Sequence, residues 1–287
     1  MPKSLLLVAG GYCIGDALKA ADLIQRRTEQ GWTVSLVVGA YAEPAWRFLQ
    51  EMTTIPIASI EVAAETRYHP PVDYDDMTLF WQRFVQGQTG RHWSDVTWPC
   101  EEMDRTVVGG TMDGYDRVEW LRWEALHPPY RCLPLTVRDE TLSSDIEARL
   151  PRRPWIGIQA NTKTGDLKRI PAITEADYPW PVVAFGDDAT YLRSDWIHMT
   201  GQPLSVVAAC LRRCTVFVGI ASAVTRLAAM LGVPTLMCHY CAAVVPNDGV
   251  SRDCLHGTDM TLPMWMELET WIMDFTTTWE VQADAAG

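Results

Sequence analysis

The feature that most constrains this fold is a continuous apolar run followed by regularly alternating helix and strand patterns. Leu5-Leu6-Leu7-Val8-Ala9 lacks the polar alternation of a half-exposed strand, which is typical of a strand buried on both faces of a parallel sheet. Residues 16–30 then carry one apolar helical stripe that ends before Gly31. Strands over 33–38 and 55–60, with a helix over 44–52 between them, complete a β-α-β-α-β order. This order predicts a doubly wound half.

A second strand-first pattern begins after Leu150-Pro151-Arg152-Arg153-Pro154, whose prolines indicate a linker. Strands are expected over 155–159, 182–185, 215–218 and 235–238, and helices over 204–213 and 222–231. We therefore predict an α/β protein with two Rossmann-like doubly wound domains facing a cleft, over 1–150 and 151–262. An apolar helical face over 265–279 predicts a C-terminal helix within 263–287, and a crossing back to the first domain is one possible arrangement.

The middle of the chain, residues 66–131, loses this rhythm. The pattern of residues 115–126 predicts a helix, and the rest of this region is expected to form long loops. Loops of this length are usually functional or disordered, and the aromatic content argues against disorder. Acceptor-contacting loops and a satellite core remain equally good interpretations of the tryptophans in this region, which are Trp81, Trp93, Trp98, Trp120 and Trp123.

Charge and hydropathy narrow the classes of partner. The net charge of −12 opposes nucleic acid and anionic membranes, although basic residues gather locally between Arg149 and Arg169. No apolar run approaches the roughly 18 residues of a membrane-spanning helix. The N-terminal run is too short for a signal peptide, so we expect a cytoplasmic protein with reduced cysteines. A zinc site is a weaker alternative, with Cys238, Cys241, Cys254 and His256 as its ligands.

Residues 220–223 combine small side chains with one hydroxyl at the expected start of a helix. Ser222 is a good N-cap, and small neighbours would leave the free N–H groups of the first turn open to an anion. Arg226 lies one helical turn further on, on the same face. The structural alternative is that Ser222 only caps the helix, the small residues pack and Arg226 is solvated.

The segment Val218-Gly219-Ile220-Ala221-Ser222-Ala223-Val224-Thr225-Arg226-Leu227-Ala228-Ala229-Met230-Leu231-Gly232-Val233-Pro234-Thr235 resembles V-G-N-D-S-G-x-x-H-L-A-x-x-L-G-V-P-T. That pattern is typical of heptosyltransferase-like glycosyltransferases of family 9. Ile14-Gly15-Asp16-Ala17-Leu18 is similar to the family's G-x-G-D helix start. Lys168-Arg169-Ile170-Pro171 is similar to its K-x-W-P, and residues 198–204 are similar to its D-L-T-G-x-x-S-L. The resemblance covers both halves in order and implies the GT-B fold, with the nucleotide held by the second domain.

Three family positions are replaced in this chain. The aspartate before the serine is Ala221, the glycine after it is Ala223, and the histidine is Arg226. These replacements put in doubt any donor-specific contact that the family makes from those positions. A helix N-terminus, a hydroxyl and a cation still suit a diphosphate.

The resemblance implies an inverting transfer of a sugar from a nucleotide-diphosphate sugar to an acceptor hydroxyl. Asp16 would be the general base, although taken alone it is equally an acidic residue favoured by a helix N-terminus. Lys168 would neutralise phosphate charge. No cofactor or metal is required beyond the donor itself. The expected substrate-binding residues are Gly11, Gly15, Asn161, Lys163, Asp187, Ser222, Ala223 and Arg226.

The sequence leaves open which acceptor the protein uses and whether it catalyses transfer. A saccharide or glycolipid hydroxyl is the expected acceptor. An alternative is DNA carrying hydroxymethylated bases. The basic residues between Arg149 and Arg169, called the basic strip below, favour this acceptor, and the net charge opposes it. A non-catalytic nucleotide-sugar-binding protein is a third possibility, because family positions have been replaced.

Overall fold

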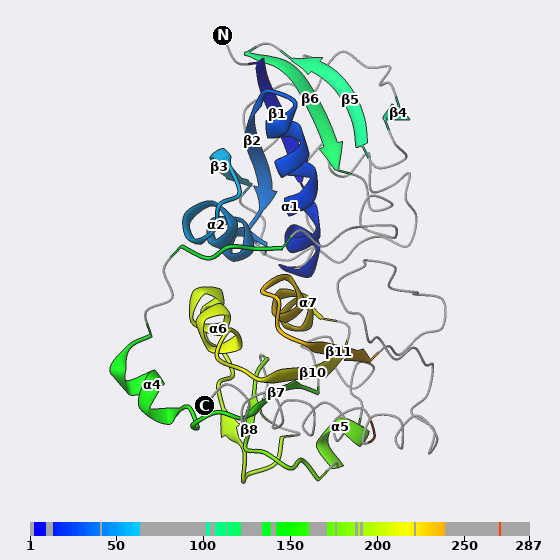
Figure 1. The fold of residues 1–287 in the computed structure, drawn as a ribbon. Coiled ribbons are helices and arrows are strands. Elements are labelled where there is room, and N and C mark those ends of the chain that lie inside the picture. The colour runs from blue at the N-terminus through cyan, green and yellow to red at the C-terminus, as the bar shows by residue number, and fades with distance from the viewer. Residues whose placement is uncertain are drawn as a thin grey trace. The chain divides into compact units, whose positions relative to one another are not determined.

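The computed structural model describes two compact units, and the main division between them falls between Asp139 and Glu140. Its elements are drawn in Figure 1. Among the described residues no helix is long and apolar enough to cross a membrane. The described residues are 3–9, 14–40, 42–63, 102–103, 107–112, 114–121, 134–138, 142–160, 171–175, 177–186, 189, 192–220, 222–238 and 270.

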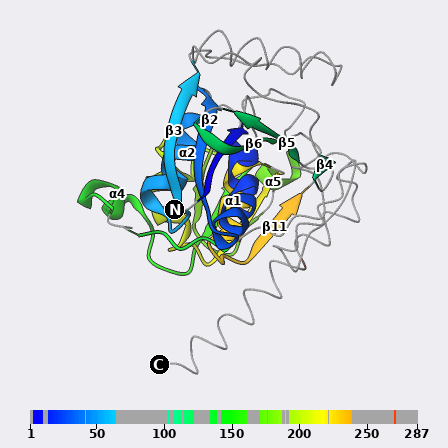
Figure 2. The same cartoon turned by 90° about the horizontal axis from the view of Figure 1, so that it is seen from above.

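The first unit is built on a six-stranded sheet in the order β3-β2-β1-β6-β5-β4. β1 pairs in parallel with both β2 and β6, and β2 pairs in parallel with β3, whereas β5 is antiparallel to β6 and to β4. All six strands are labelled in Figure 1, and Figure 2 shows β2 to β6 from above. The strands span Lys3–Ala9 (β1), Trp32–Gly39 (β2), Ile57–Ala63 (β3), Glu102–Met103 (β4), Val107–Met112 (β5) and Tyr115–Leu121 (β6).

Two helices pack on this sheet, α1 (Ile14–Glu29) and α2 (Glu43–Met52). α1 follows the apolar stripe read from the sequence, and Gly31 with φ +86° turns the chain into β2. Pro44 lies in the first turn of α2, where its missing N–H costs no helical hydrogen bond. The apolar run of β1 is fully buried from Leu5 to Ala9. The two expected helices and three expected strands of this half are confirmed, with ends shifted by a few residues.

The helix expected over 115–126 is wrong, because residues 115–121 form the strand β6 next to β1. The long loops expected in the rest of this region are also wrong at residues 102–103 and 107–112, which form the strands β4 and β5. The charged Glu119 interrupts the apolar pattern that is typical of a strand in the middle of a sheet. Its carboxylate is 1% exposed and forms ion pairs with Arg27 at 2.7 Å and Arg117 at 2.8 Å. Those two guanidinium groups replace the water that a carboxylate otherwise needs.

The second unit is built on a five-stranded sheet in the order β11-β10-β7-β8-β9, with every pair parallel. Numbered within the unit this is the strand order 3-2-1-4-5 of a Rossmann fold, so the order reverses between β7 and β10. The expected doubly wound second half is confirmed. The strands span Ile156–Gln159 (β7), Val182–Ala184 (β8), Ile197–His198 (β9), Val216–Ile220 (β10) and Thr235–Cys238 (β11).

Helices α6 (Leu204–Leu211) and α7 (Ala223–Met230) pack against each other, and α7 packs on β10 and β11. Gly232 with φ +77° follows α7 and lets the chain turn into β11. Two shorter helices are α4 (Ser144–Arg149) and α5 (Pro171–Glu175). The core of this unit gathers strand residues such as Ile158 and Val218 with the buried Trp180 and Trp196.

Some expectations fall on parts of the chain that the structure does not describe. Residues 263–287 are outside the described residues except Thr270, so the expected C-terminal helix is not tested. Trp81, Trp93, Trp98 and Trp123 are also outside, as is the side chain of Trp120. The domain limits 1–150, 151–262 and 263–287 and the cleft between the domains stay predictions.

Candidate functional site

The strand order of the second sheet indicates where a ligand would bind. β7 and β10 are parallel neighbours, with Gln159 opposite Gly219, so both end at the same edge of the sheet. The strand that follows β7 in the chain, β8, lies on one side of this pair, and the strand that follows β10, β11, lies on the other side. In open α/β sheets ligands bind outside the carboxyl ends of the strands at such a reversal. The candidate site is therefore the edge where Gln159 and Ile220 end their strands.

Ser222 caps the helix that begins at this edge. Its backbone is extended, with φ −145° and ψ 173°, and its Oγ accepts a hydrogen bond from the N–H of Thr225 at 3.3 Å. Its carbonyl accepts from the N–H of Arg226 at 3.1 Å. This is the geometry of an N-cap, so the cap predicted from the sequence is confirmed. Ala223 is the first helical residue and half-buried.

Small residues at this turn have a packing reason at Gly219. Thr225 is fully buried, and its hydroxyl donates to the carbonyl of Ile220 at 2.7 Å. A Cβ atom added at Gly219 would collide with that hydroxyl and lie 2.8 Å from the Phe217 ring. Gly219 therefore allows the first turn of α7 to approach β10 closely.

Gln159 is a functional candidate that the sequence analysis missed. It is 5% exposed at the carboxyl end of β7, and its Oε1 accepts a hydrogen bond from the Ser222 hydroxyl. That bond connects the end of β7 to the N-cap of α7, where the order of the sheet reverses. The available signal was one polar residue at the end of an otherwise apolar strand, Trp155-Ile156-Gly157-Ile158-Gln159.

Arg226 is buried in α7, with 8% of its surface exposed. The structural alternative required a solvated Arg226, and that part of it is wrong. A buried arginine keeps its charge, because the guanidinium does not lose its proton in proteins. The helix that begins at the candidate site therefore carries a fixed positive charge one turn inside.

The first unit offers a comparable edge. Its strand order reverses between β1 and β6, which are parallel neighbours. α1 follows β1 and begins at Ile14, so Gly15 and Asp16 lie in its first turn, on the carboxyl side of β1. Gly11, in the loop between β1 and α1, lies outside the described residues.

The other expected site residues are not described by the structure. Asn161, Lys163 and Lys168 follow β7, and Asp187 follows β8. The expected zinc ligands Cys241, Cys254 and His256 are outside as well, while Cys238 ends β11. Among the described residues no cluster of histidine, cysteine and acidic side chains could hold a metal ion.

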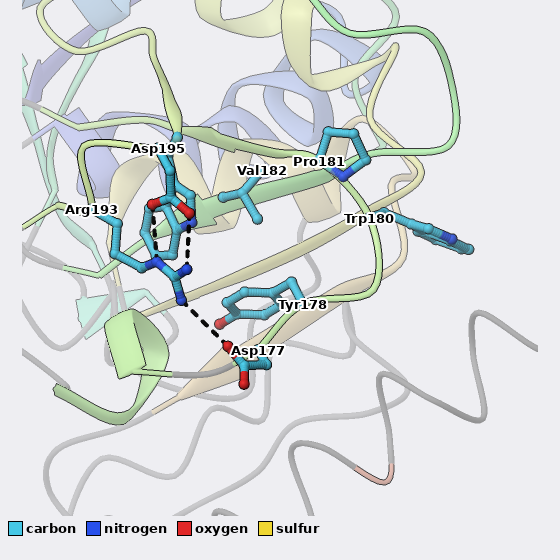
Figure 3. Close-up of a pocket in the computed structure, with 8 residues that line it drawn as sticks. Asp177, Tyr178, Trp180, Pro181, Val182, Arg193 and Asp195 are labelled. Atoms are coloured by element: carbon cyan, nitrogen blue, oxygen red, sulfur yellow. Dashed lines mark hydrogen bonds and ion pairs between the residues drawn. The ribbon is translucent and has the colours of Figure 1, made fainter.

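A polar pocket of about 150 Å³ lies at the amino ends of the strands of the second sheet, among residues that precede β8 and β9 (Figure 3). Arg193 lines it and donates to Asp195 from Nε at 3.0 Å and from Nη2 at 2.8 Å. Its Nη1 lies 3.6 Å from the carboxylate of Asp177. The hydrogen bonds from Arg193 lower the pKa of Asp195 below its ordinary value. Because this pocket borders the amino ends of parallel strands, it is separate from the candidate site.

Part of the basic strip is engaged within the second unit. Arg149 donates to the carbonyl of His198 at 2.7 Å. Arg153 donates to the carbonyls of Arg213 at 2.6 Å and Arg212 at 2.5 Å, at the C-terminal end of α6. Cations are favourable at a helix C-terminus. These two arginines therefore have a structural role that needs no nucleic acid.

No model of a known protein family matches the sequence, and no curated protein matches it. Solved structures do match. The glycosyl transferase family 9 structure from Veillonella parvula has a TM-score of 0.51 at 13% identity, covering 90% of this chain and 87% of that chain. The ADP-heptose LPS heptosyltransferase II from E. coli has a TM-score of 0.50 at 13% identity, covering 95% and 99%. The likeness runs over nearly the whole of each chain, and at this identity it concerns the fold. The chain therefore has the GT-B fold of family 9 glycosyltransferases, as its sequence resemblance predicted.

Proposed function

We propose that this protein transfers a sugar from a nucleotide-diphosphate donor to an acceptor hydroxyl. One observation carries the proposal: the segment that resembles the family 9 pattern forms β10, the capped N-terminus of α7 and β11, at the reversal of the strand order. The likeness of the whole fold to two glycosyltransferase structures supports it. Because one of them is named for ADP-heptose, ADP-linked sugars are the first donors to test.

On the donor side, the diphosphate would lie at the start of α7. Ser222 and Ala223 begin this helix, and Arg226 places a positive charge one turn inside. A helix N-terminus and a nearby cation both stabilise the negative charge that grows on a leaving diphosphate. Lys168 is assigned to neutralise that charge, and Asn161, Lys163 and Asp187 to hold the rest of the donor.

On the acceptor side, Asp16 is assigned as general base, with Gly11 and Gly15 allowing a close approach of the substrate to the backbone. The acceptor oxygen attacks the anomeric carbon while its proton passes to the Asp16 carboxylate. The bond from that carbon to the diphosphate oxygen breaks, and its electron pair leaves with the diphosphate. Attack from the face opposite the leaving group inverts the configuration. No resident cofactor takes part in this scheme.

A saccharide or glycolipid hydroxyl is the acceptor that this proposal favours over hydroxymethylated DNA. The net charge of −12 opposes DNA. Arg149 and Arg153, two members of the basic strip, already bond to backbone carbonyls of their own unit. A DNA acceptor would instead be supported by transfer that falls steeply as the salt concentration rises.

The substitution Asp16→Asn tests the assigned mechanism. It keeps the size of the side chain and removes its ability to take a proton, so we expect transfer to fall by roughly 10²- to 10⁴-fold. The measurement is release of nucleoside diphosphate from a panel of nucleotide sugars with saccharide, glycolipid and hydroxymethylated-DNA acceptors. Calorimetric affinity for the donor should be unchanged.

Asp22→Asn is the matched control for this test. Asp22 lies further along the same helix and forms an ion pair with Arg26 at 3.0 Å, so its substitution should leave turnover near normal. Full activity of Asp16→Asn would refute the base assignment. Donor binding by the native protein without turnover on any acceptor would instead support a non-catalytic nucleotide-sugar-binding protein.

A further inference from the structure

The two polar atoms of the Gln159 amide differ in their contacts. Its side chain is 5% exposed, and its Oε1 is bound to the Ser222 hydroxyl. Among the described residues no hydrogen bond engages its amide nitrogen, Nε2, which carries two N–H donors. At the mouth of a candidate site these N–H groups are available to a ligand that accepts hydrogen bonds.

The neighbouring hydroxyls cannot serve as that donor to a ligand, because each has one proton and that proton is already used. The Ser222 hydroxyl donates to Gln159, and its oxygen accepts from the N–H of Thr225. The Thr225 hydroxyl donates to the carbonyl of Ile220 at 2.7 Å. Ser222 therefore orients the Gln159 amide and caps α7. Of these three side chains, Gln159 is the one with N–H groups to spare.

We propose that Gln159 Nε2 donates a hydrogen bond to a phosphate oxygen of the bound nucleoside diphosphate. This inference rests on the proposed function and names a further contact in its donor site. Three features support it: Gln159 ends β7 opposite Gly219 at the reversal of the strand order, its amide meets the capped start of α7, and it adds no charge of its own. It supplies a contact from β7 at a site where family positions on the α7 side are replaced by Ala221 and Ala223.

The substitution Gln159→Glu separates this role from a structural one. A carboxylate has nearly the same shape and still accepts from the Ser222 hydroxyl, but it has no N–H and repels phosphate. We expect calorimetric affinity for ADP, UDP or GDP, whichever the native protein binds, to fall by about 10- to 150-fold or more, the range for a hydrogen bond to a charged group. Because a carboxylate is costly to bury, thermal stability without ligand should also fall, so the affinities are compared at a temperature where both proteins are folded.

Gln50→Glu is the matched control, because Gln50 lies in α2 of the first unit and donates to the carbonyl of Ile57 at 3.2 Å. Its nucleoside diphosphate affinity should equal that of the native protein. If Gln159→Glu folds poorly, Gln159→Met takes its place, since methionine has similar length and no donor, and the same loss of at least about tenfold is expected.

The outcomes are distinct. Native affinity in Gln159→Glu, or in Gln159→Met where that variant is used, would overturn the assignment of Gln159 and leave the proposed function intact. No binding of ADP, UDP or GDP by the native protein would overturn both. Weaker binding in the Gln159 variant with native affinity in Gln50→Glu supports the assignment.

Discussion

At the scale of single residues, the turn between β10 and α7 combines packing with a candidate binding role. The sequence identified Ser222 as a cap and pointed to an anion site, and the cap is confirmed. It did not reveal Gln159 or Thr225, because their contacts join residues that are distant in sequence or buried beneath the turn. Small side chains alone are consistent with either role. The structure explains Gly219 by packing and leaves the N-terminal turn of α7 as the proposed donor contact.

Gly219→Ala should destabilise the protein by about 1–3 kcal/mol, the usual cost of overpacking a core. The added methyl group collides with the Thr225 hydroxyl and lies 2.8 Å from Phe217. Urea unfolding measures the loss. Thr225→Ala removes the hydroxyl with which the added methyl group collides. The stability lost by the double variant should therefore be smaller than the sum of the losses in the two single variants. Strict additivity would show that Gly219 and Thr225 do not restrain each other.

At the scale of elements, the parallel strands were predictable and β6 was not. The apolar runs of β1, β7 and β10 require burial on both faces, and that requirement is visible in sequence. In β6 the buried Glu119 interrupts the apolar pattern, and its two arginine partners come from α1 and from β6 itself. A pairing over 92 residues has no local signal. Long-range ion pairing therefore set the limit of the prediction for this strand.

Cys214 connects β7 to the start of β10 and predicts a pH dependence. Its Sγ accepts from the N–H of Gly157 at 3.1 Å and donates to the carbonyl of Val216 at 2.7 Å. Burial raises the pKa of this thiol to about 12, against about 8.5 for a free cysteine. As the pH rises above about 8.5 the unfolded chain loses this proton while the folded chain keeps it, so the free energy of unfolding falls.

Cys214→Ser should weaken this alkaline loss, because a serine hydroxyl can make both hydrogen bonds and does not ionise in this range. Between pH 7.5 and 10.5 the native protein should lose roughly 1–3 kcal/mol more than the variant, as measured by urea unfolding at both pH values. Cys210→Ser is the control, since burial raises the pKa of Cys210 to about 11 and the effect should be no larger. Equal losses in native protein and Cys214→Ser would contradict the assignment.

At the scale of the whole molecule, two strand-first halves were enough to predict doubly wound α/β units, and the family resemblance implied the GT-B fold. In each half helices connect parallel strands, as α1 does for β1 and β2 and α7 does for β10 and β11, and each sheet reverses its strand order beside its first strand. The assignment of donor to the second unit and acceptor to the first stays a prediction, and it can be tested unit by unit.

Hydrogen exchange with and without a nucleoside diphosphate should show which unit holds the donor. At 100 times its dissociation constant a ligand stabilises the state that binds it by about 2.7 kcal/mol. If the diphosphate lies at the start of α7, amide exchange should slow in β7, β10 and α7 of the second unit. Exchange in β1 and β2 of the first unit should change little, because a ligand alters local opening most where it bonds. Gln159→Glu at the same ligand concentration should lose most of this protection. Protection confined to β1 and α1 would place the nucleotide in the first unit and reverse the proposed roles of the two halves.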